Sequence, residues 1–325
     1  MQTQQQPPRL LERVRVTMRL RRMAKSSEQS YLHWIREYLR YHRPRHPREM
    51  GRKEVEAFLS HLSQRRYVSR STQNQALSAL LFLYNNVLDQ PLDDRVNAVR
   101  AKRRRQIPVV LHPTEVRRLL SHLSGTPHLI AQLLYGAGLR IDECLSLRIH
   151  QVDFVNTWII LKDAKGGKDR ITLLPKSLIP TLANHIVRVK RMHDNDLHNG
   201  LGQAFLPGAF HLKNPGASRD FRWQFLFPSD RVFYDEKTGN AGRWHVHADT
   251  FRSVFQSAVR ECGFTKRVTP HTLRHSFATH ILASGCDVRL LQSLLGHNSL
   301  STTMLYAHMA DHRLALVDSP LDVLA

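Results

Sequence analysis

Between residues 10 and 88, large apolar residues recur at steps of three and four, which is the period of amphipathic helices. The three clearest runs carry Tyr31, Trp34, Ile35, Tyr38 and Leu39; Val55, Phe58, Leu59 and Leu62; and Leu77, Leu80, Leu81, Tyr84 and Leu88. Ser26 or Ser27 is expected to cap the first of these helices and Ser71 the third, because serine accepts hydrogen bonds from N-terminal amides. Pro44 and Pro47 end the first run. Together with the apolar positions from Leu10 onward, the pattern predicts a bundle of four helices.

The pattern changes after residue 110. Helices are expected to begin near Pro113 and Pro127, and two β-prone runs on either side of Gly166-Gly167 predict a hairpin within residues 158–173. Further helical periods cover 176–194, 249–262, 271–284, 287–295 and 301–308. Residues 195–243 are rich in Gly, Pro, Asn and scattered aromatics, and they predict neither a core helix nor a core strand. The fold class is therefore mainly α with a small antiparallel β-sheet.

Residues 91–108 contain few large apolar side chains and include the basic run Arg100–Arg105. Such a composition suits an extended linker lying along phosphates, although a solvated tether is the simpler alternative. We expect a helical domain at 1–92, a basic linker at 93–110 and a second domain at 111–325. A C-terminal tail follows residue 308.

The charge balance indicates the class of partner. Lys and Arg number 48 against 27 acidic residues, a net charge of +21, and residues 1–110 alone hold 23 basic and 9 acidic residues. An excess of this size favours a polyanion. An anionic membrane is the alternative, but no apolar run approaches the about 20 residues of a spanning helix, and the first residues are polar. We expect a cytoplasmic, nucleoid-associated bacterial protein with no membrane partner.

The sequence gives little support for a metal site or for disulfide bonds. Cys144, Cys262 and Cys286 form no Cys-x-x-Cys pair, which argues against a disulfide framework or a thiolate zinc site. His245 and His247 form a His-x-His pair with Asp249 as the one close carboxylate, and a structural or DNA-contacting role is favoured over metal ligation. No metal and no cofactor are predicted.

A different set of residues suits the cleavage of a phosphodiester without metal. His271 and Arg274 lie in His-x-x-Arg-His, His297 follows Leu-Gly, and Tyr306 comes nine residues later, while Arg140 and Lys165 lie upstream. Arginine forks match two phosphate oxygens and stabilise the charge of the transition state. A tyrosine nucleophile would give a 3′-phosphotyrosine that keeps the bond energy, so ATP is not needed.

In this scheme Lys165 is the preferred general acid for the leaving 5′-oxygen, and Lys168 is the second choice. His271 takes the tyrosine proton or orients the phosphate. Singly, each residue has a plainer interpretation: Arg140 as an ion-pair partner of Asp142 or Glu143, and Tyr306 as a half-buried core phenol. Their order along the chain favours the catalytic interpretation.

This order resembles the tyrosine recombinase family, also called the phage integrase family. The resemblance places the family's six catalytic residues on Arg140, Lys165, His271, Arg274, His297 and Tyr306, and its acidic residue on Glu143. It implies a helical, SAM-like core-binding domain and an α/β catalytic domain that together form a C-shaped DNA clamp. It also implies a homotetramer that exchanges strands through a Holliday junction, with the tail docked on a neighbouring protomer.

Within that family the chain resembles an integron integrase, on the basis of residues 45–51, 71–80 and 206–228. The resemblance implies an insertion at about 195–243 and the insertion and excision of gene cassettes. Its DNA partners would be a duplex attachment site and a folded single-stranded cassette-site hairpin. Trp223 is the expected stacking platform for an unpaired base, because an exposed indole can stack on any base; the alternative is that Trp223 is buried under the catalytic core. The other expected DNA contacts are Arg219, Arg222, Arg243, His245, Lys168, Arg103, Arg104 and Arg105.

Two alternatives remain open from the sequence. One is a Xer-like or phage-type recombinase acting on duplex sites, or a type IB topoisomerase with the same chemistry. The other is a non-catalytic DNA-binding protein, whose basic surface would look the same.

Overall fold

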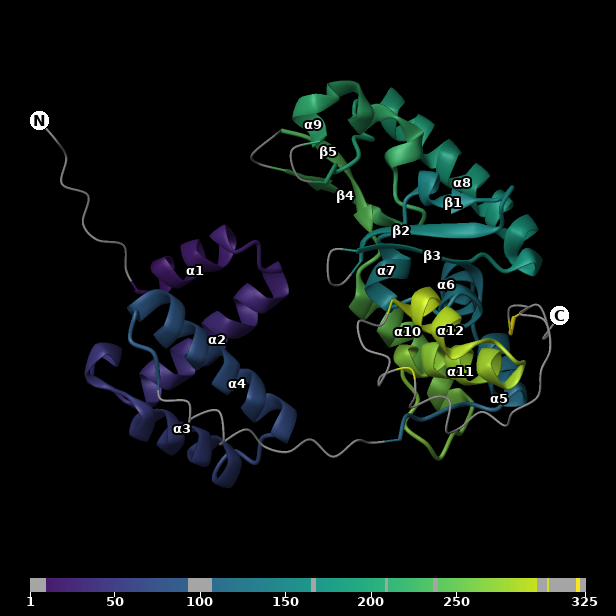
Figure 1. The fold of residues 1–325 in the computed structure, drawn as a ribbon. Helices are drawn as coiled ribbons and strands as arrows, with labels where there is room; N and C mark the ends of the chain where they lie inside the picture. Colours follow the sequence, from purple (N-terminus) through teal and green to yellow (C-terminus); the bar gives the residue numbers. More distant parts are fainter. Residues whose placement is uncertain are drawn as a thin grey trace, which may run out of the picture. The chain divides into compact units, whose positions relative to one another are not determined.

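The computed structural model describes residues 10–92, 107–164, 168–207, 210–235 and 239–296, together with 303, 320 and 321. The chain divides into two compact units, one ending at Gln106 and the other beginning at Ile107 (Figure 1). Each unit has a hydrophobic core of its own.

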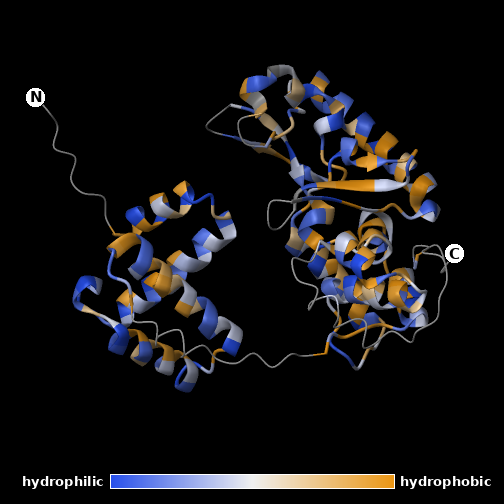
Figure 2. Cartoon of the chain, in the orientation of Figure 1, coloured by the Kyte–Doolittle hydropathy of each residue, from blue (hydrophilic) through white to orange (hydrophobic). Residues whose placement is uncertain are grey.

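The first unit is a helical bundle, as the apolar period predicts. It contains α1 (Leu10–Leu20), α2 (Lys25–Tyr41), α3 (Arg52–Gln64) and α4 (Arg70–Leu83), which continues into one π-helical turn at Tyr84–Leu88; a 3-10 turn at Pro47–Glu49 precedes α3. On α3 the buried residues are Val55, Phe58, Leu59 and Leu62, the same four that the spacing indicates. Figure 2 shows hydrophobic and hydrophilic residues sharing each of these helices, which is typical of elements packed on one side only.

The two serine caps do not lie where the sequence predicts them. Helix α4 begins after Ser69, whose hydroxyl accepts a 3.1 Å hydrogen bond from the Thr72 amide, so Ser71 lies inside the first turn. Helix α2 begins at Lys25 with Ala24 at its N-cap and no side-chain hydrogen bond, so Ser26 and Ser27 are also helical. A cap needs an extended backbone, and several nearby polar residues meet the sequence rule equally well.

The second unit combines helices with two small antiparallel sheets. Its elements are α5 (Pro113–Ser121), α6 (Gly125–Gly136), α7 (Ile141–Leu145), β1 (Val152–Asp153), β2 (Trp158–Ala164), β3 (Lys168–Leu173), α8 (Ile179–His198), α9 (Phe210–Lys213), β4 (Pro228–Tyr234), β5 (Ala241–His245), α10 (Ala248–Glu261), α11 (Pro270–Ala283) and α12 (Val288–Leu295). The sheets have the orders β1-β2-β3 and β4-β5. This architecture confirms a mainly helical fold with a small antiparallel sheet. The helix expected at 301–308 lies outside the described residues, apart from residue 303.

Residues 195–243 are more ordered than their composition indicates. Helix α8 continues to His198, and β4 with most of β5 lies within the segment. The side chains of Phe225, Leu226 and Phe227 are buried, and Phe227 belongs to the core of the unit. The sequence indicated no core strand here, and the hairpin it missed is not a core element: no residue of β4 is buried, Phe233 and Tyr234 are exposed, and pairing with β5 rather than an apolar alternation defines the strand.

Strand β3 turns two polar side chains inward. Arg170 and Thr172 lie opposite Leu161 and Ile159 of β2, which are both buried, whereas Ile171 between them is exposed. Thr172 is satisfied by a 2.8 Å hydrogen bond to the Ala137 carbonyl. The inward face of β3 therefore delivers Arg170 to the interior of the unit.

Among the residues with described structure, no helix combines the length and the apolar character that crossing a membrane requires.

Candidate functional site

Arg140 is fixed by the first turn of α7. It is the residue before the helix, and its amide donates to Glu143 Oε2 at 2.8 Å while its guanidinium Nη1 donates to Glu143 Oε1 at 2.7 Å. The chain reaches this position through Gly138, whose φ is +62°. A Cβ at Gly138 would lie 2.5 Å from the Phe277 ring, so both the backbone angle and the packing require glycine. The ion pair named as the plainer interpretation of Arg140 therefore exists.

Arg274 is an internal arginine of α11. Its side chain is 2% exposed, and its guanidinium donates to the Gly138 carbonyl and, at 2.6 Å, to the Leu295 carbonyl. His271 lies one turn earlier on the same helix and is exposed. The His271 ring stands 5.3 Å from the His275 ring at an interplanar angle of 82°.

The surroundings of His275 lower the pKa of its imidazole. Burial lowers the pKa of its imidazole to about 4, and the charges of His271 and Arg274 act in the same direction. His275 is therefore neutral at physiological pH.

Glu143 joins the arginines into one cluster. Arg170 donates to both of its oxygens, at 2.8 and 2.6 Å, and Arg274 lies 3.8 Å away. Burial by itself raises the pKa of Glu143, but hydrogen bonds and charge from Arg170, with hydrogen bonds from Arg140, lower it to about 2. The carboxylate is thus ionised and shared among three cations.

The same three arginines meet the C-terminal end of α12. Arg170 Nε donates to the Leu294 carbonyl at 3.0 Å, Arg274 to Leu295 at 2.6 Å and Arg140 to Gly296 at 3.4 Å. A helix end carries carbonyls that lack intrahelical partners and a partial negative charge, so cations are favoured there. Gly296, at φ +62°, closes the helix directly before His297.

The structure therefore describes three of the six predicted catalytic residues: Arg140, His271 and Arg274. The two arginines converge on the C-terminal end of α12. The other three, Lys165, His297 and Tyr306, lie outside the described residues. Their roles remain predictions.

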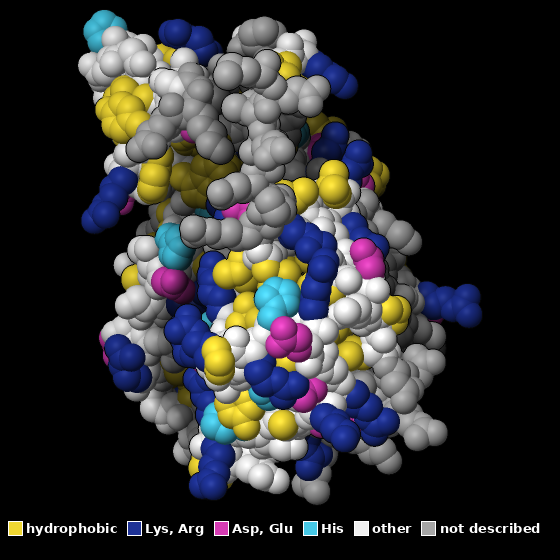
Figure 3. Space-filling view, turned by 90° about the vertical axis from the view of Figure 1, so that its left-hand side faces the viewer, with side chains coloured by type: hydrophobic (Ala, Val, Ile, Leu, Met, Phe, Trp, Pro, Cys, Tyr) yellow, Lys and Arg dark blue, Asp and Glu magenta, His cyan; other side chains and the backbone are white. Residues whose placement is uncertain are grey.

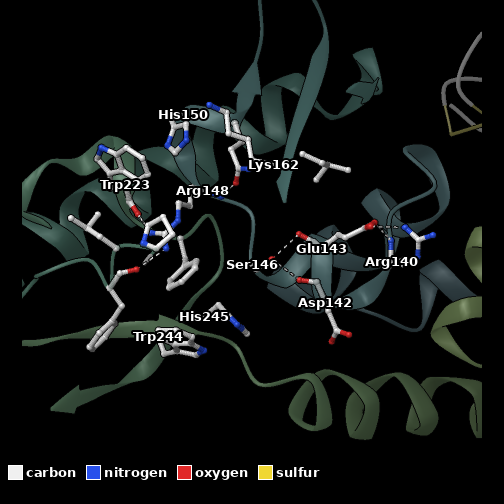
Figure 4. Close-up of a pocket in the computed structure, with 16 residues that line it drawn as sticks. Arg140, Asp142, Glu143, Ser146, Arg148, His150, Lys162, Trp223, Trp244 and His245 are labelled. Carbon is white, nitrogen blue, oxygen red and sulfur yellow. Dashed lines mark hydrogen bonds and ion pairs between the residues drawn. The ribbon is translucent and has the colours of Figure 1, made fainter. Parts of the chain in front are cut away.

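A pocket of about 680 Å³ opens beside Arg140. Figure 4 shows Arg140 and Glu143 at one end, Trp223, Arg148 and His150 at the other, and Trp244 and His245 along a side. Its walls come from α7, from β2 and the chain between these two elements, and from the 205–245 segment. The sequence did not indicate that this segment lies next to Arg140.

Arg148 holds two loops of that segment against the rest of the unit. Its guanidinium donates to the Trp223 carbonyl and, at 2.7 Å, to the Phe205 carbonyl, and it lies 4.4 Å over the Phe225 ring. Burial lowers the pKa of Arg148 to about 10. Sequence reasoning missed this residue because a single arginine after an apolar run carries no distinctive spacing.

Trp223 lies between the two alternatives that the sequence left open, an exposed stacking platform and a buried core indole. It is half-buried, with the Phe210 ring 4.5 Å and the His150 ring 4.6 Å from its own. Trp244, which no sequence motif indicated, is 42% exposed and contacts the rings of Phe205 and Phe225. Of the two indoles, Trp244 offers more open surface.

The other predicted DNA contacts have different surroundings. Arg243 pairs with Asp196 of α8 at 2.6 and 2.9 Å and also donates to the Ser229 and Asp230 carbonyls, so it fastens β5 to α8. Arg219 is exposed, and Arg222 is exposed and paired with Asp220.

His245 lines the pocket and donates through Nδ1 to the Val246 carbonyl at 2.8 Å, and burial lowers its pKa. The side chain of Lys168 and the residues Arg103, Arg104 and Arg105 lie outside the described part.

Comparison with protein families gives two matches in tandem. Residues 10–94 match the phage integrase N-terminal SAM-like domain, and residues 109–313 match the phage integrase family. The second match spans more than half of the chain.

Curated relatives cover nearly the whole length. The chain is 44% identical over 316 residues to proteins described as integrase/recombinase from Escherichia coli and Pseudomonas aeruginosa, covering 97% of this chain and 94% of each relative. It is 30% identical over 305 residues to tyrosine recombinase XerA of Thermococcus kodakarensis, covering 93% and 91%.

Two solved structures share the fold. A lambda integrase dimer bound to a core site aligns with a TM-score of 0.61 at 15% identity, covering 95% of this chain and 98% of that one. XerH recombinase bound to palindromic difH in a post-cleavage complex aligns with a TM-score of 0.59 at 19% identity, covering 93% and 82%. At these identities the likeness concerns the fold.

Proposed function

Because the chain belongs to the phage integrase family of tyrosine site-specific recombinases, we propose that it cleaves and rejoins DNA through a 3′-phosphotyrosine, without metal or ATP. Tyr306 attacks the scissile phosphorus, and its oxygen replaces the 5′-oxygen of the departing strand. Lys165 supplies the proton to that oxygen, and His271 takes the tyrosine proton or orients the phosphate. A 5′-hydroxyl from a second strand reverses the step.

Arg140, Arg274 and His297 hold the non-bridging oxygens in this scheme. The observation that supports it is the convergence of Arg140 and Arg274 on the end of α12, directly before His297. Guanidinium groups fixed in advance stabilise the developing charge of the transition state without reorganisation. DNA is the proposed partner, and the solved relatives bound to a core site and to difH support it.

The nucleophile is tested with a nicked suicide duplex followed by a denaturing gel. The unsubstituted protein should form a covalent adduct, and Tyr306→Phe should bind the same DNA without forming one. Tyr67→Phe, which removes an exposed hydroxyl from the first unit, is the control and should still form the adduct. An adduct with Tyr306→Phe would exclude Tyr306 as the nucleophile, and no adduct with the unsubstituted protein would favour a non-catalytic DNA-binding protein.

For the substrate we favour an integron-type reaction, in which the protein acts on folded single-stranded cassette sites as well as duplex sites. The pocket beside Arg140 supports it, because aromatic side chains and the half-buried Arg148 suit an unpaired base extruded next to the scissile phosphate. Base stacking on an aromatic side chain contributes about 1 to 3 kcal/mol. Trp244 joins Trp223 as a candidate platform.

Strand transfer on folded top-strand, folded bottom-strand and duplex sites tests this choice. Trp244→Ala and Trp223→Ala should lower transfer on the folded site by about 5- to 100-fold, from the loss of one stack, and change the duplex reaction much less. Trp158→Ala is the matched control, since Trp158 is 43% exposed and does not line the pocket. Deleting residues 195–243 is a poor test, because the deletion removes the buried Phe225, Leu226 and Phe227.

A Xer-like reaction on duplex sites is the second candidate, favoured by the XerA relative. Transfer restricted to duplex DNA and indifferent to Trp223 and Trp244 would establish it in place of the integron-type reaction. In either case we propose a homotetramer on DNA that resolves a Holliday junction.

A further inference from the structure

Arg170 is a buried arginine that none of the proposed catalytic steps uses. It lies on the inward face of β3, where Leu161 is its cross-strand neighbour, and its side chain is 7% exposed. An arginine in such a position is costly unless its donors are all engaged. The contacts of Arg170 therefore indicate its role in the protein.

Those contacts connect three elements. Through Nη1 and Nη2 it holds both oxygens of Glu143 on α7, and through Nε it holds the Leu294 carbonyl at the end of α12. Its side chain also fills the space next to Gly296, where a Cβ would lie 2.7 Å from Arg170 Cδ. Arg170 thus fixes the turn that presents Arg140 and the helix end that precedes His297.

The charges in the cluster add a second effect. Glu143 is 2.7 Å from Arg140 Nη1, so a carboxylate without another partner would compete with a phosphate for the Arg140 guanidinium. Because Arg170 occupies both carboxylate oxygens, the cluster keeps an excess of positive charge when Arg140, Arg170, Arg274 and Glu143 are counted together.

We propose that Arg170 is a positioning residue for strand cleavage: by clamping Glu143 and the end of α12, it holds Arg140 and Arg274 ready for the scissile phosphate. This inference rests on the proposed function of the two arginines. It gives β3 a positioning role that is separate from the proposed general-acid role of Lys165, which precedes the strand.

The test is single-turnover adduct formation on the nicked duplex at protein concentrations where the DNA is fully bound. Arg170→Met should slow cleavage by about 100-fold, the effect of a displacement of about 1 Å in a catalytic group, with DNA affinity little changed. Arg170→Lys keeps one charge but not the bidentate geometry, and we expect a loss of about 10-fold. A loss of affinity with an unchanged cleavage rate in the bound state would contradict the proposal.

Lys266→Met is the matched control for a plain loss of stability. It removes a 2.6 Å ion pair with Glu115 and a 3.2 Å hydrogen bond to the Val110 carbonyl in the same unit, neither of which involves a residue of the cluster. At a temperature where all variants are folded by circular dichroism, it should cleave at the unsubstituted rate. If Arg170→Met does not fold, Arg170→Lys alone decides the matter, and a folded Arg170→Lys that cleaves at the unsubstituted rate overturns the proposal.

A double-variant cycle tests whether Arg170 acts through Glu143. If it does, Arg170→Met combined with Glu143→Gln should cleave faster than Arg170→Met alone, because the unbalanced carboxylate is gone. Losses that simply multiply would overturn that part of the mechanism. Absence of adduct formation by the unsubstituted protein would instead overturn the proposed function itself, so the two failures are distinguishable.

Discussion

At the scale of single residues, the site depends on buried charge that is compensated locally. Arg140, Arg170 and Arg274 lie around one carboxylate and one helix end, and each of them interacts with both. The sequence identified Arg140, Arg274 and Glu143 through their motifs. It did not identify Arg170, because inside a β-prone run an arginine is normally assigned to the solvent face.

His275 gives a prediction at this scale. The pKa of His275 in the folded protein is about 4, below its ordinary value of 6.5, so folding is opposed wherever the unfolded chain binds a proton at this position. The stability that depends on a neutral His275 is fully present above pH 6.5 and is lost as the pH falls toward 4. The free energy of unfolding falls by up to about 3 kcal/mol over this range. The loss of unfolding free energy over this range should therefore be smaller in His275→Gln than in the unsubstituted protein.

The measurement is chemical denaturation at pH values from 7.5 to about 4.5. His33→Gln, at an exposed position of the first unit, is the control, and its stability curve should run parallel to that of the unsubstituted protein. If the His275→Gln curve also runs parallel to that of the unsubstituted protein, burial of the His275 imidazole is not the cause of the loss of stability at acid pH.

At the scale of elements, helix periodicity and the hairpin expected at 158–173 are confirmed, the latter by β2 and β3, whereas a second hairpin was missed. Helices α10, α11 and α12 lie within one residue of their expected ranges, and α3 buries the four residues that its spacing indicates. The β4-β5 hairpin went unrecognised because its strands are held by pairing and by Arg243, with aromatic side chains left exposed.

Arg148 gives the prediction at this scale. Arg148→Met leaves the Trp223 and Phe205 carbonyls without their shared donor, which should cost about 1 to 3 kcal/mol and loosen the loops that wall the pocket. Hydrogen exchange should become faster in residues 203–207 and 221–225 and remain unchanged in α11.

Arg231→Met, on the exposed side of β4, is the control and should leave exchange in both loops as it was. Unchanged exchange in Arg148→Met would mean that the loops are held by their aromatic contacts alone.

At the scale of the whole molecule, the excess of basic residues is the feature that most affects binding to DNA. In Figure 3, Lys and Arg side chains are spread over much of the face shown, with Asp and Glu side chains between them. Net charge acts on DNA largely through the release of counterions, so affinity should fall steeply as salt rises.

Changing Arg103, Arg104 and Arg105 together to Gln should flatten the plot of log affinity against log salt, by about 0.9 in slope for each phosphate that the variant no longer neutralises. Changing the exposed Arg260, Arg267 and Arg289 to Gln removes the same net charge from the second unit and is the control. Equal flattening by both triple changes would show that residues 103–105 act only through net charge.

Sequence alone determined what depends on local order: the helical period of the first unit, the hairpin around Gly166-Gly167, the basic character and the motifs that carry the family. Tertiary structure decided what depends on distance in space: that the 205–245 segment walls a pocket beside Arg140, that Trp223 is half-buried while Trp244 is more exposed, and that Arg170 faces inward. The reason is physical. A helix or a tight turn is encoded by neighbours along the chain, whereas the compensation of a buried charge depends on groups that only folding brings together, such as Arg170 and Glu143.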